Sequence, residues 1–282
     1  MRISLAWLAI ASLASATPAP VYPGYKVVWS DTFGGKAGAS PDKGRWNLIT
    51  DVQTNGEVQT YTTSSQNLQL SGGDTVQLVP RKSKSGKWTS ARIETKSTFT
   101  PSAGKITSFE AVIRFGDNGA GQKQGIWPAF WMLGDAVHHG TPWPLCGELD
   151  IMESVNGLPT AYGTTHCGKG EKGGPCNEPN GRGGSVGSDN GWHTWTLQVD
   201  RTNGGDWRGE VIRWLKDGQV YHSMSGADIG DQGIWATLAH SPLFIILNVA
   251  VGGSWPGAPN GNTVGSYGSM MEVEYVAVYK ST

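Results

Sequence analysis

Polar and apolar residues alternate along most of the chain between Tyr22 and Lys280, with the period of two that a half-buried β-strand shows. The clearest examples are the segments 26–29, 75–79, 91–96, 109–115, 193–200 and 271–279. Residues 243–251 are almost all apolar, which predicts a strand buried on both faces. Asp217-Gly218 is the dipeptide of a tight hairpin turn, here within 210–224.

Helical periodicity is almost absent. Only residues 234–239 suggest a short turn of helix, and neither a repeat of fixed length nor a Pro- or Ser-rich linker divides the chain. Many short strands in one uninterrupted block predict an all-β fold, an antiparallel β-sandwich. Such domains run past about 200 residues, so we expect a single domain over residues 17–282.

The beginning of the chain has a different pattern. Arg2 is followed by the apolar run 3–13 and by the small residues Ala14-Ser15-Ala16, which is the order found in a secretory signal peptide. A membrane anchor would need roughly 20 apolar residues. We therefore expect residues 1–16 to be removed and the mature protein to be secreted to the extracellular space, with no membrane partner.

Composition and charge exclude two classes of protein, nucleic-acid-binding proteins and disordered chains. The 22 Lys and Arg residues nearly balance the 23 Asp and Glu residues, for a formal net charge of −1, so the basic surface of a nucleic-acid-binding protein is excluded. The 41 glycines and 13 tryptophans suit aromatic-rich strands joined by tight turns and argue against disorder. No feature of the sequence indicates an oligomer, and we expect a monomer.

Three cysteines, Cys146, Cys167 and Cys176, allow one disulfide in a secreted protein. A bond between Cys167 and Cys176 would close a Gly-rich loop that has little apolar content to order it, and we favour this pairing. Cys146 would then be a buried thiol. A bond from Cys146 to one of the other two is the alternative. A zinc site is disfavoured because no C-x-x-C spacing is present.

Three carboxylates lie close together in the segment 148–153, Glu-Leu-Asp-Ile-Met-Glu. In a regular strand Glu148 and Asp150 share one face, but Glu153 would point to the apolar side, where an ionised carboxylate is costly. A β-bulge at 151–152 would return Glu153 to the face of the other two. We therefore predict a bulged central strand with three carboxylates on one face.

This arrangement suits catalysis. Glycoside hydrolysis needs two carboxylates of separated pKa, one ionised as a nucleophile and one protonated as an acid. The carboxylate between them, Asp150, would tune the pair by sharing a proton. A solvated acidic edge is the alternative, but the neighbouring residues are apolar. A Ca²⁺ site would more often show Asp/Asn/Gly loop spacing.

The segment 148–153 matches the bulged ExDxxE signature of glycoside hydrolase family 16, and the chain resembles the laminarinase-like branch of that family, above all secreted fungal endo-1,3(4)-β-glucanases. Other segments match in the same order: 55–61, 125–133, 248–253 and 274–279. The resemblance covers essentially the whole mature chain. It implies a β-jelly-roll with a substrate cleft across its concave face, in agreement with the sandwich predicted from the strand pattern.

By this resemblance Glu148 is the nucleophile, Glu153 the general acid/base and Asp150 the assisting carboxylate. No cofactor is implied for the reaction. Several relatives have Asp, as a structural Ca²⁺ ligand, where this chain has Glu274. Glutamate also binds calcium, but the departure from Asp leaves open whether this chain has the site, and we do not predict one.

Aromatic side chains bind sugars by stacking on the C–H faces of pyranose rings. Trp127 and Trp131 are four residues apart and share one strand face beside the catalytic strand. Trp255 lies in a Gly-rich loop. We expect these three tryptophans to bind substrate, with burial in the sandwich core as the alternative for Trp127 and Trp131.

Polar groups at the rim of a sugar site fix the orientation of the substrate. The resemblance implies four of them: Asn55, Glu57, Arg92 and His166. His166 as an ordinary half-buried histidine is the alternative. An ion pair of Arg92 with Glu94 on the same strand face would be structural rather than functional.

Together these residues predict an endo-acting, retaining β-glucanase whose partner is a β-1,3-linked or mixed β-1,3-1,4-linked glucan. The alternatives are a glucan transglycosylase, whose usual relatives carry the unbulged motif, and a non-catalytic glucan-recognition module, which would have lost one or both glutamates. We expect the loop 168–188 to influence linkage preference.

Overall fold

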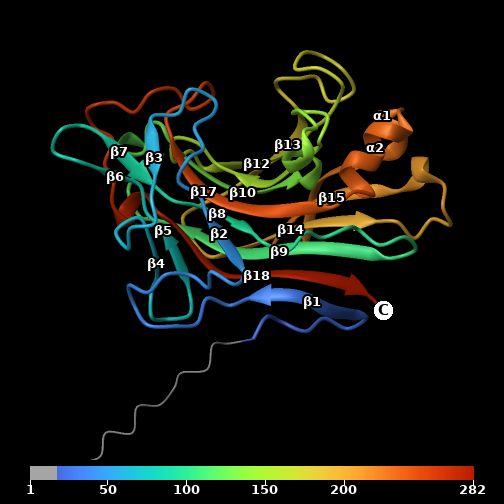
Figure 1. Cartoon of the computed structure of the whole chain (residues 1–282), viewed down its shortest axis with the longest axis horizontal. Coiled ribbons are helices and arrows are strands. Elements are labelled where there is room, and N and C mark those ends of the chain that lie inside the picture. The colour runs from blue at the N-terminus through green and yellow to red at the C-terminus, as the bar shows by residue number, and fades with distance from the viewer. Residues whose placement is uncertain (1–17) are drawn as a thin grey trace, which may run out of the picture.

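The computed structural model describes residues 18–282, which form two curved antiparallel sheets packed face to face (Figure 1). The expected signal peptide, residues 1–16, lies outside the described residues. Within residues 18–282, no helix is long and apolar enough to cross a membrane. The predicted all-β sandwich is confirmed.

The first sheet has eight strands in the order β16-β15-β14-β9-β18-β5-β4, and β1 also pairs with β18. These strands are β1 (Tyr25–Asp31), β4 (Leu68–Leu70), β5 (Val76–Leu78), β9 (Ile106–Phe115), β14 (His193–Asp200), β15 (Val211–Lys216), β16 (Gln219–Ser225) and β18 (Met271–Ser281). The hairpin expected at Asp217-Gly218 joins β15 to β16.

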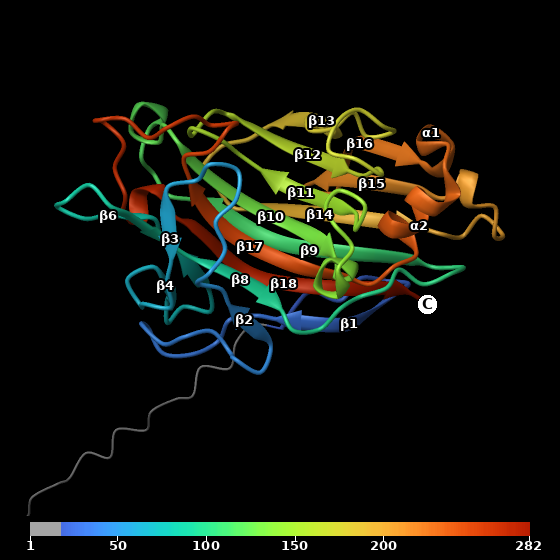
Figure 2. The same ribbon diagram turned by 45° about the horizontal axis from the view of Figure 1, so that its top comes forward.

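The second sheet has seven strands in the order β13-β12-β11-β10-β17-β8-β2, seen obliquely in Figure 2. These strands are β2 (Trp46–Leu48), β8 (Arg92–Thr95), β10 (Ile126–Gly134), β11 (Glu148–Glu153), β12 (Thr160–His166), β13 (Arg182–Gly187) and β17 (Leu243–Val251). All residues of β17 are buried, so the strand predicted to be covered on both faces is confirmed.

A small third sheet and several short helices complete the fold. The sheet consists of β3 (Gln59–Tyr61), β7 (Trp88–Ser90) and β6 (Arg81–Lys82). The helices are α1 (Gly226–Ile229), α2 (Gln232–Ala239) and the 3₁₀ turns η1 (Ala120–Gln122), η2 (Asp135–His139), η3 (Trp207–Gly209) and η4 (Tyr267–Ser269). Helix α2 contains the expected helical turn, and Asp231 caps its first N–H groups.

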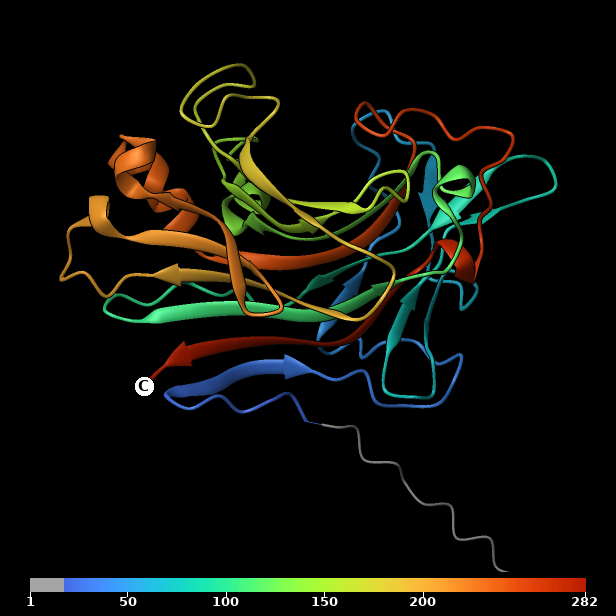
Figure 3. The same ribbon diagram turned by 180° about the vertical axis from the view of Figure 1, so that it is seen from behind.

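The core lies between the two large sheets, where their inner faces meet. Leu149 and Ile151 of β11 and Phe109 of β9 are at most 1% exposed within this single large cluster. Alternate residues of β11 therefore face the core or the outer surface of the seven-stranded sheet. That outer surface is concave, and the β12–β13 loop and the β3–β7 pair rise at its opposite ends (Figures 1 and 3).

Candidate active site

The catalytic-type carboxylates lie on β11, near the middle of the concave sheet, and a β-bulge sets their direction. Against β10, the pairing passes from Asp150 to Met152 and leaves Ile151 without a partner. Against β12, the register also shifts between Asp150 and Glu153. The predicted bulge is confirmed, and the extra residue gives Glu153 the same facing as Asp150 and Glu148.

The opposing sheet holds the bulge through hydrogen bonds that the sequence pattern did not indicate. Trp214 donates its indole N–H to the backbone oxygen of Asp150 over 2.8 Å, and the Tyr221 hydroxyl donates to the oxygen of Ile151 over 3.2 Å. Both rings cross beneath Gly163 of β12, where an added Cβ would lie 2.3 Å from the Trp214 ring. Glycine at this position therefore makes room for the two aromatic donors.

Each glutamate is held by a different tryptophan. Trp143 donates its indole N–H to Oε2 of Glu148 over 3.1 Å, and Trp127 donates to Oε1 of Glu153 over 2.9 Å. Trp143 was missed by the sequence reasoning, although it stands five residues before Glu148 in a Pro-flanked segment. The two carboxylates thus have separate, fixed orientations on the concave face.

Burial raises the pKa of all three carboxyl groups. At Glu153 the largest effect is the loss of solvent, which raises the pKa to about 7 although the hydrogen bond from Trp127 lowers it. Burial also raises the pKa of Glu148, opposed mainly by the positive charge of His166 and the bond from Trp143. Asp150 lies between two carboxylates, and burial together with both of them raises its pKa well above the usual value.

This order of electrostatic effects separates the two glutamates. An indole N–H donor and the positive charge of His166 favour the ionised form of both glutamates, and Arg92 acts on Glu148 in addition. Glu153, with its pKa of about 7, keeps its proton at mildly acidic pH. Burial and the neighbouring carboxylates favour the protonated form of Asp150. The arrangement can therefore present a nucleophile and a general acid together.

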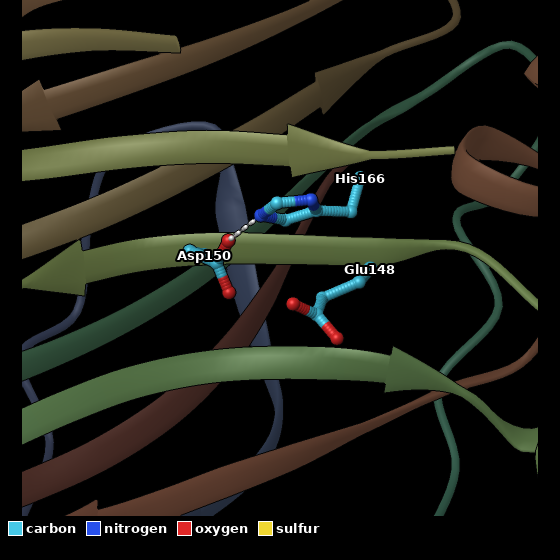
Figure 4. Close-up of side chains that lie close together, drawn as sticks. All are labelled: Glu148, Asp150 and His166. Carbon is cyan, nitrogen blue, oxygen red and sulfur yellow. Dashed lines mark ion pairs between the residues drawn. The ribbon is translucent and has the colours of Figure 1, made fainter. Parts of the chain in front are cut away.

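His166 lies at the end of β12, beside the carboxylates (Figure 4). Its Nε2 is 3.6 Å from Oδ2 of Asp150, and its Nδ1 is 2.7 Å from Oε2 of Glu178. Burial lowers the pKa of His166, but the bond to Glu178 and the surrounding carboxylates outweigh this and raise it. Glu178 was missed by the sequence reasoning; the only signal was its position two residues after Cys176.

Arg92 is half of a buried ion pair and also covers a tryptophan. Its guanidinium contacts Oε1 of Glu94 over 2.7 Å, which is the structural pairing weighed from the sequence. It also lies 4.9 Å from the ring centre of Trp131. The Trp131 indole N–H donates to Asn248 over 2.7 Å. Arg92 therefore fixes Trp131 and contributes positive charge near Glu148.

The two predicted N-terminal residues differ in their environments. Asn55 is exposed with φ of 54°, and its backbone oxygen accepts from the N–H of Ser254. Glu57 is 8% exposed, and Gln59 donates to it over 2.6 Å. The Asn55 segment thus adjoins the Trp255 loop, whereas the Glu57 carboxylate is occupied by its own strand neighbours.

Three aromatic rings cluster next to Glu153. Trp255 is 44% exposed and makes edge contacts with Trp127, at 5.6 Å between ring centres, and with Tyr162, at 5.1 Å. Tyr162 pairs with Glu153 across β11 and β12 and was not identified from the sequence. Trp127 and Trp131 are only partly buried, so neither is a core residue.

The disulfide joins Cys167 to Cys176, with 5.3 Å between the Cα atoms, as favoured from the sequence. It closes the loop that leads from β12 to Glu178. Cys146 is a buried free thiol, and burial raises its pKa to about 11.

Potential metal ligands come together at one place in residues 18–282. Only one group of three potential ligands converges there, namely Glu148, Asp150 and His166. Its His166 Nδ1 is bonded to Glu178, and the group forms an ion-paired cluster rather than an open coordination site. Glu274 is exposed on β18 and belongs to no such group in the described range.

The chain is similar to known proteins over most of its length. Residues 37–205 match the family model described as "XgeA-like, catalytic GH16 domain". The solved endo-1,3-beta-glucanase of Streptomyces sioyaensis is 37% identical, with a TM-score of 0.87, over 94% of this chain and 99% of that one.

Two curated proteins are also similar along nearly the whole chain. Glucan endo-1,3-beta-glucosidase A1 of Niallia circulans is 29% identical over 93% of this chain, and the chain spans 39% of that protein's length. The Beta-glucanase of Rhodothermus marinus is 28% identical over 92% of this chain and 86% of its own length.

Proposed function

Because the chain belongs to glycoside hydrolase family 16, we propose that it is a secreted, endo-acting β-glucanase that hydrolyses β-1,3-linked and mixed-linkage glucans with retention of configuration. The relatives' names, endo-1,3-β-glucanase and β-glucanase, support this substrate class. The likeness to fungal members and the monomeric state stay predictions.

One observation supports the mechanism above all: a bulged strand presents Glu148, Asp150 and Glu153 on one concave face, and the two glutamates have different donors and charges around them. In the first step Glu153 gives its proton to the glycosidic oxygen while Glu148 attacks the anomeric carbon. The bond to the leaving sugar breaks, and a covalent glycosyl-enzyme forms.

In the second step Glu153, now ionised, takes a proton from water. The water oxygen attacks the anomeric carbon, the bond to Glu148 breaks, and the sugar leaves with its original configuration. The raised pKa of Glu153, about 7, suits a group that is an acid in one step and a base in the next. Asp150 holds or releases a proton as the charge on Glu148 changes.

The test is hydrolysis of laminarin, barley mixed-linkage glucan and carboxymethylcellulose in parallel, by the secreted chain and by its Glu148→Gln variant. We expect rapid release of internal oligosaccharides from laminarin, and a loss of about a thousandfold in the variant. Glu171→Gln is the matched control, because Glu171 is exposed in the disulfide loop. Turnover of none of the three glucans would contradict the proposal.

The same assay separates the two alternatives. Products longer than the starting oligosaccharide would identify a transglycosylase. Tight binding of laminarin without any products would identify a recognition module.

A further inference from the structure

Glu178 is a fully buried carboxylate that does not belong to the catalytic strand. It lies in the loop between β12 and β13, and its side chain is 0% exposed. Each of its oxygens has a partner: Oε1 accepts the backbone N–H of Cys167 over 2.8 Å, and Oε2 accepts from Nδ1 of His166 over 2.7 Å. A buried carboxylate is tolerated only with such partners, so this one is built into the loop.

The loop that places Glu178 is tied in two ways. The disulfide between Cys167 and Cys176 closes it two residues before Glu178. Backbone bonds in both directions, each 2.8 Å long, join Glu178 to Gly173 inside the closed loop. The carboxylate is therefore held against the end of β12 by covalent and backbone contacts, without any contribution from the exposed side chains of the loop.

The hydrogen bond from Nδ1 to Glu178 fixes the orientation of the His166 ring and therefore the direction of Nε2. When Nδ1 donates to Glu178, Nε2 of the same ring points towards Oδ2 of Asp150, 3.6 Å away. That oxygen is buried and has no hydrogen-bond partner anywhere in residues 18–282. The ring and the carboxyl thus face each other (Figure 4).

The charges around His166 favour its protonated form. Glu178 faces it from the β12–β13 loop, and Glu148, Asp150 and Glu153 face it from β11. Trp143 lies against its ring at 5.6 Å between centres and has no charge. The other cation close to the carboxylates, Arg92, is already paired with Glu94.

We propose that Glu178 is a positioning residue of the active site: it fixes the His166 ring with a protonated Nε2 directed at Asp150, and the Cys167–Cys176 disulfide keeps Glu178 in that place. His166 then serves as the counter-ion that allows one glutamate to ionise among several buried carboxyl groups. The effect on turnover rests on the proposed function, whereas the state of the His166 ring does not.

The test is ¹⁵N NMR of histidine-labelled protein, which reports both the pKa of each ring and the nitrogen that carries the proton. The chain has 6 histidines, and a His166→Gln variant assigns the signal of interest. In Glu178→Gln we expect the pKa of His166 to fall by about one unit and the fixed Nδ1–H form to be lost. Glu171→Gln, which removes the same charge from the exposed part of the loop, should leave both unchanged.

Kinetics give the second readout. In Glu178→Gln the protonated form of His166 is lost at lower pH, so the limb of kcat/KM on laminarin that depends on this counter-ion should move down by about one unit, with about a tenfold loss above it. Glu178→Asp keeps the negative charge, so its pH profile should lie between those of Glu178→Gln and the parent. The Cys167→Ala/Cys176→Ala double variant should reproduce the His166 change in part, because Glu178 is then less firmly held.

A His166 ring with unchanged pKa and tautomer in folded Glu178→Gln would overturn the proposal, even if activity fell, since the role would then be structural. If the His166 changes occur but no variant or parent cleaves a glucan, the proposed function fails while the positioning stands. If Glu178→Gln does not fold, the same decision rests on Glu178→Asp and the cysteine double variant.

Discussion

Trp127 and Glu153 are joined across two neighbouring strands by an indole N–H that donates to Oε1 over 2.9 Å. This hydrogen bond lowers the pKa of Glu153, whereas burial raises it by more, and the resulting pKa is about 7. The same indole ring supports Trp255 at the surface. One tryptophan therefore tunes the proposed acid/base and shapes the surface beside it.

Replacing Trp127 by Phe should raise the pKa of Glu153 further, because a donor to the ionised form is lost. The alkaline limb of kcat/KM should move up by about one unit. Trp131→Phe is the matched control, since its indole N–H binds Asn248 instead. A pH–rate profile for each variant checks this. An unchanged limb in Trp127→Phe would show that the bond does not influence Glu153.

The two glutamates should be distinguished by azide rescue. Glu153→Ala lacks the proton donor, so hydrolysis of unactivated glucan should fall by about a hundredfold to ten-thousandfold. An activated aryl β-glucoside should still react with Glu148, and added azide should release the β-glycosyl azide. Glu148→Ala with azide should give the α-azide. Product NMR decides, and the opposite pairing of products would reverse the two roles.

Glu153 should make the protein less stable as pH rises. Burial raises its folded pKa from 4.5 to about 7, so between these values the folded state holds a proton that the unfolded state has released. The stabilisation is complete below pH 4.5 and is lost as pH rises through about 7, by an amount on the order of 3 kcal/mol.

Glu153→Gln removes this titration. The variant should be more stable than the parent at pH 8 and should approach it near pH 4, as measured by urea unfolding at both pH values. Glu171→Gln, an exposed change of the same type, should show no such dependence. Equal pH dependence in the parent and in Glu153→Gln would mean that other groups dominate.

Thiol chemistry should find one reactive cysteine and only in unfolded protein. Cys146 is 1% exposed and burial raises its pKa to about 11, so the native thiol is neither accessible nor ionised. Alkylation in denaturant without reductant, followed by peptide mass spectrometry, should label Cys146 alone. Rapid labelling of the native protein, or a label on Cys167 or Cys176, would contradict the structure.

Trp255 should contribute to substrate binding rather than to the chemical step. Its ring is 44% exposed and lies beside Trp127, near the carboxylates. Trp255→Ala should raise KM for laminarin by about twofold to tenfold, the value of one stacked ring, with little change in kcat. Trp192 is 43% exposed and stacks against Arg114 of the other sheet, so Trp192→Ala is the control. Equal effects of both changes would exclude a specific role.

The fold class and the line of carboxylates could be predicted from the residue pattern alone. Both are local properties: the period of two is repeated along each strand, and a buried charge that falls out of phase requires an extra residue. The odd spacing from Glu148 to Glu153 was sufficient to predict the bulge in β11, which is seen in its pairing with both β10 and β12. The apolar run of β17 likewise fixed its place between two covered faces.

The groups that contact those carboxylates could not be predicted from the residue pattern. Trp214 and Tyr221 reach the bulge from the opposite sheet, 64 and 70 residues away in the chain. Glu178 reaches His166 from an irregular loop that has no periodicity to read. Such contacts depend on how two sheets stack and where a loop folds back. Each contact is made by a single side chain, so it leaves no periodic pattern in the sequence from which it could be predicted.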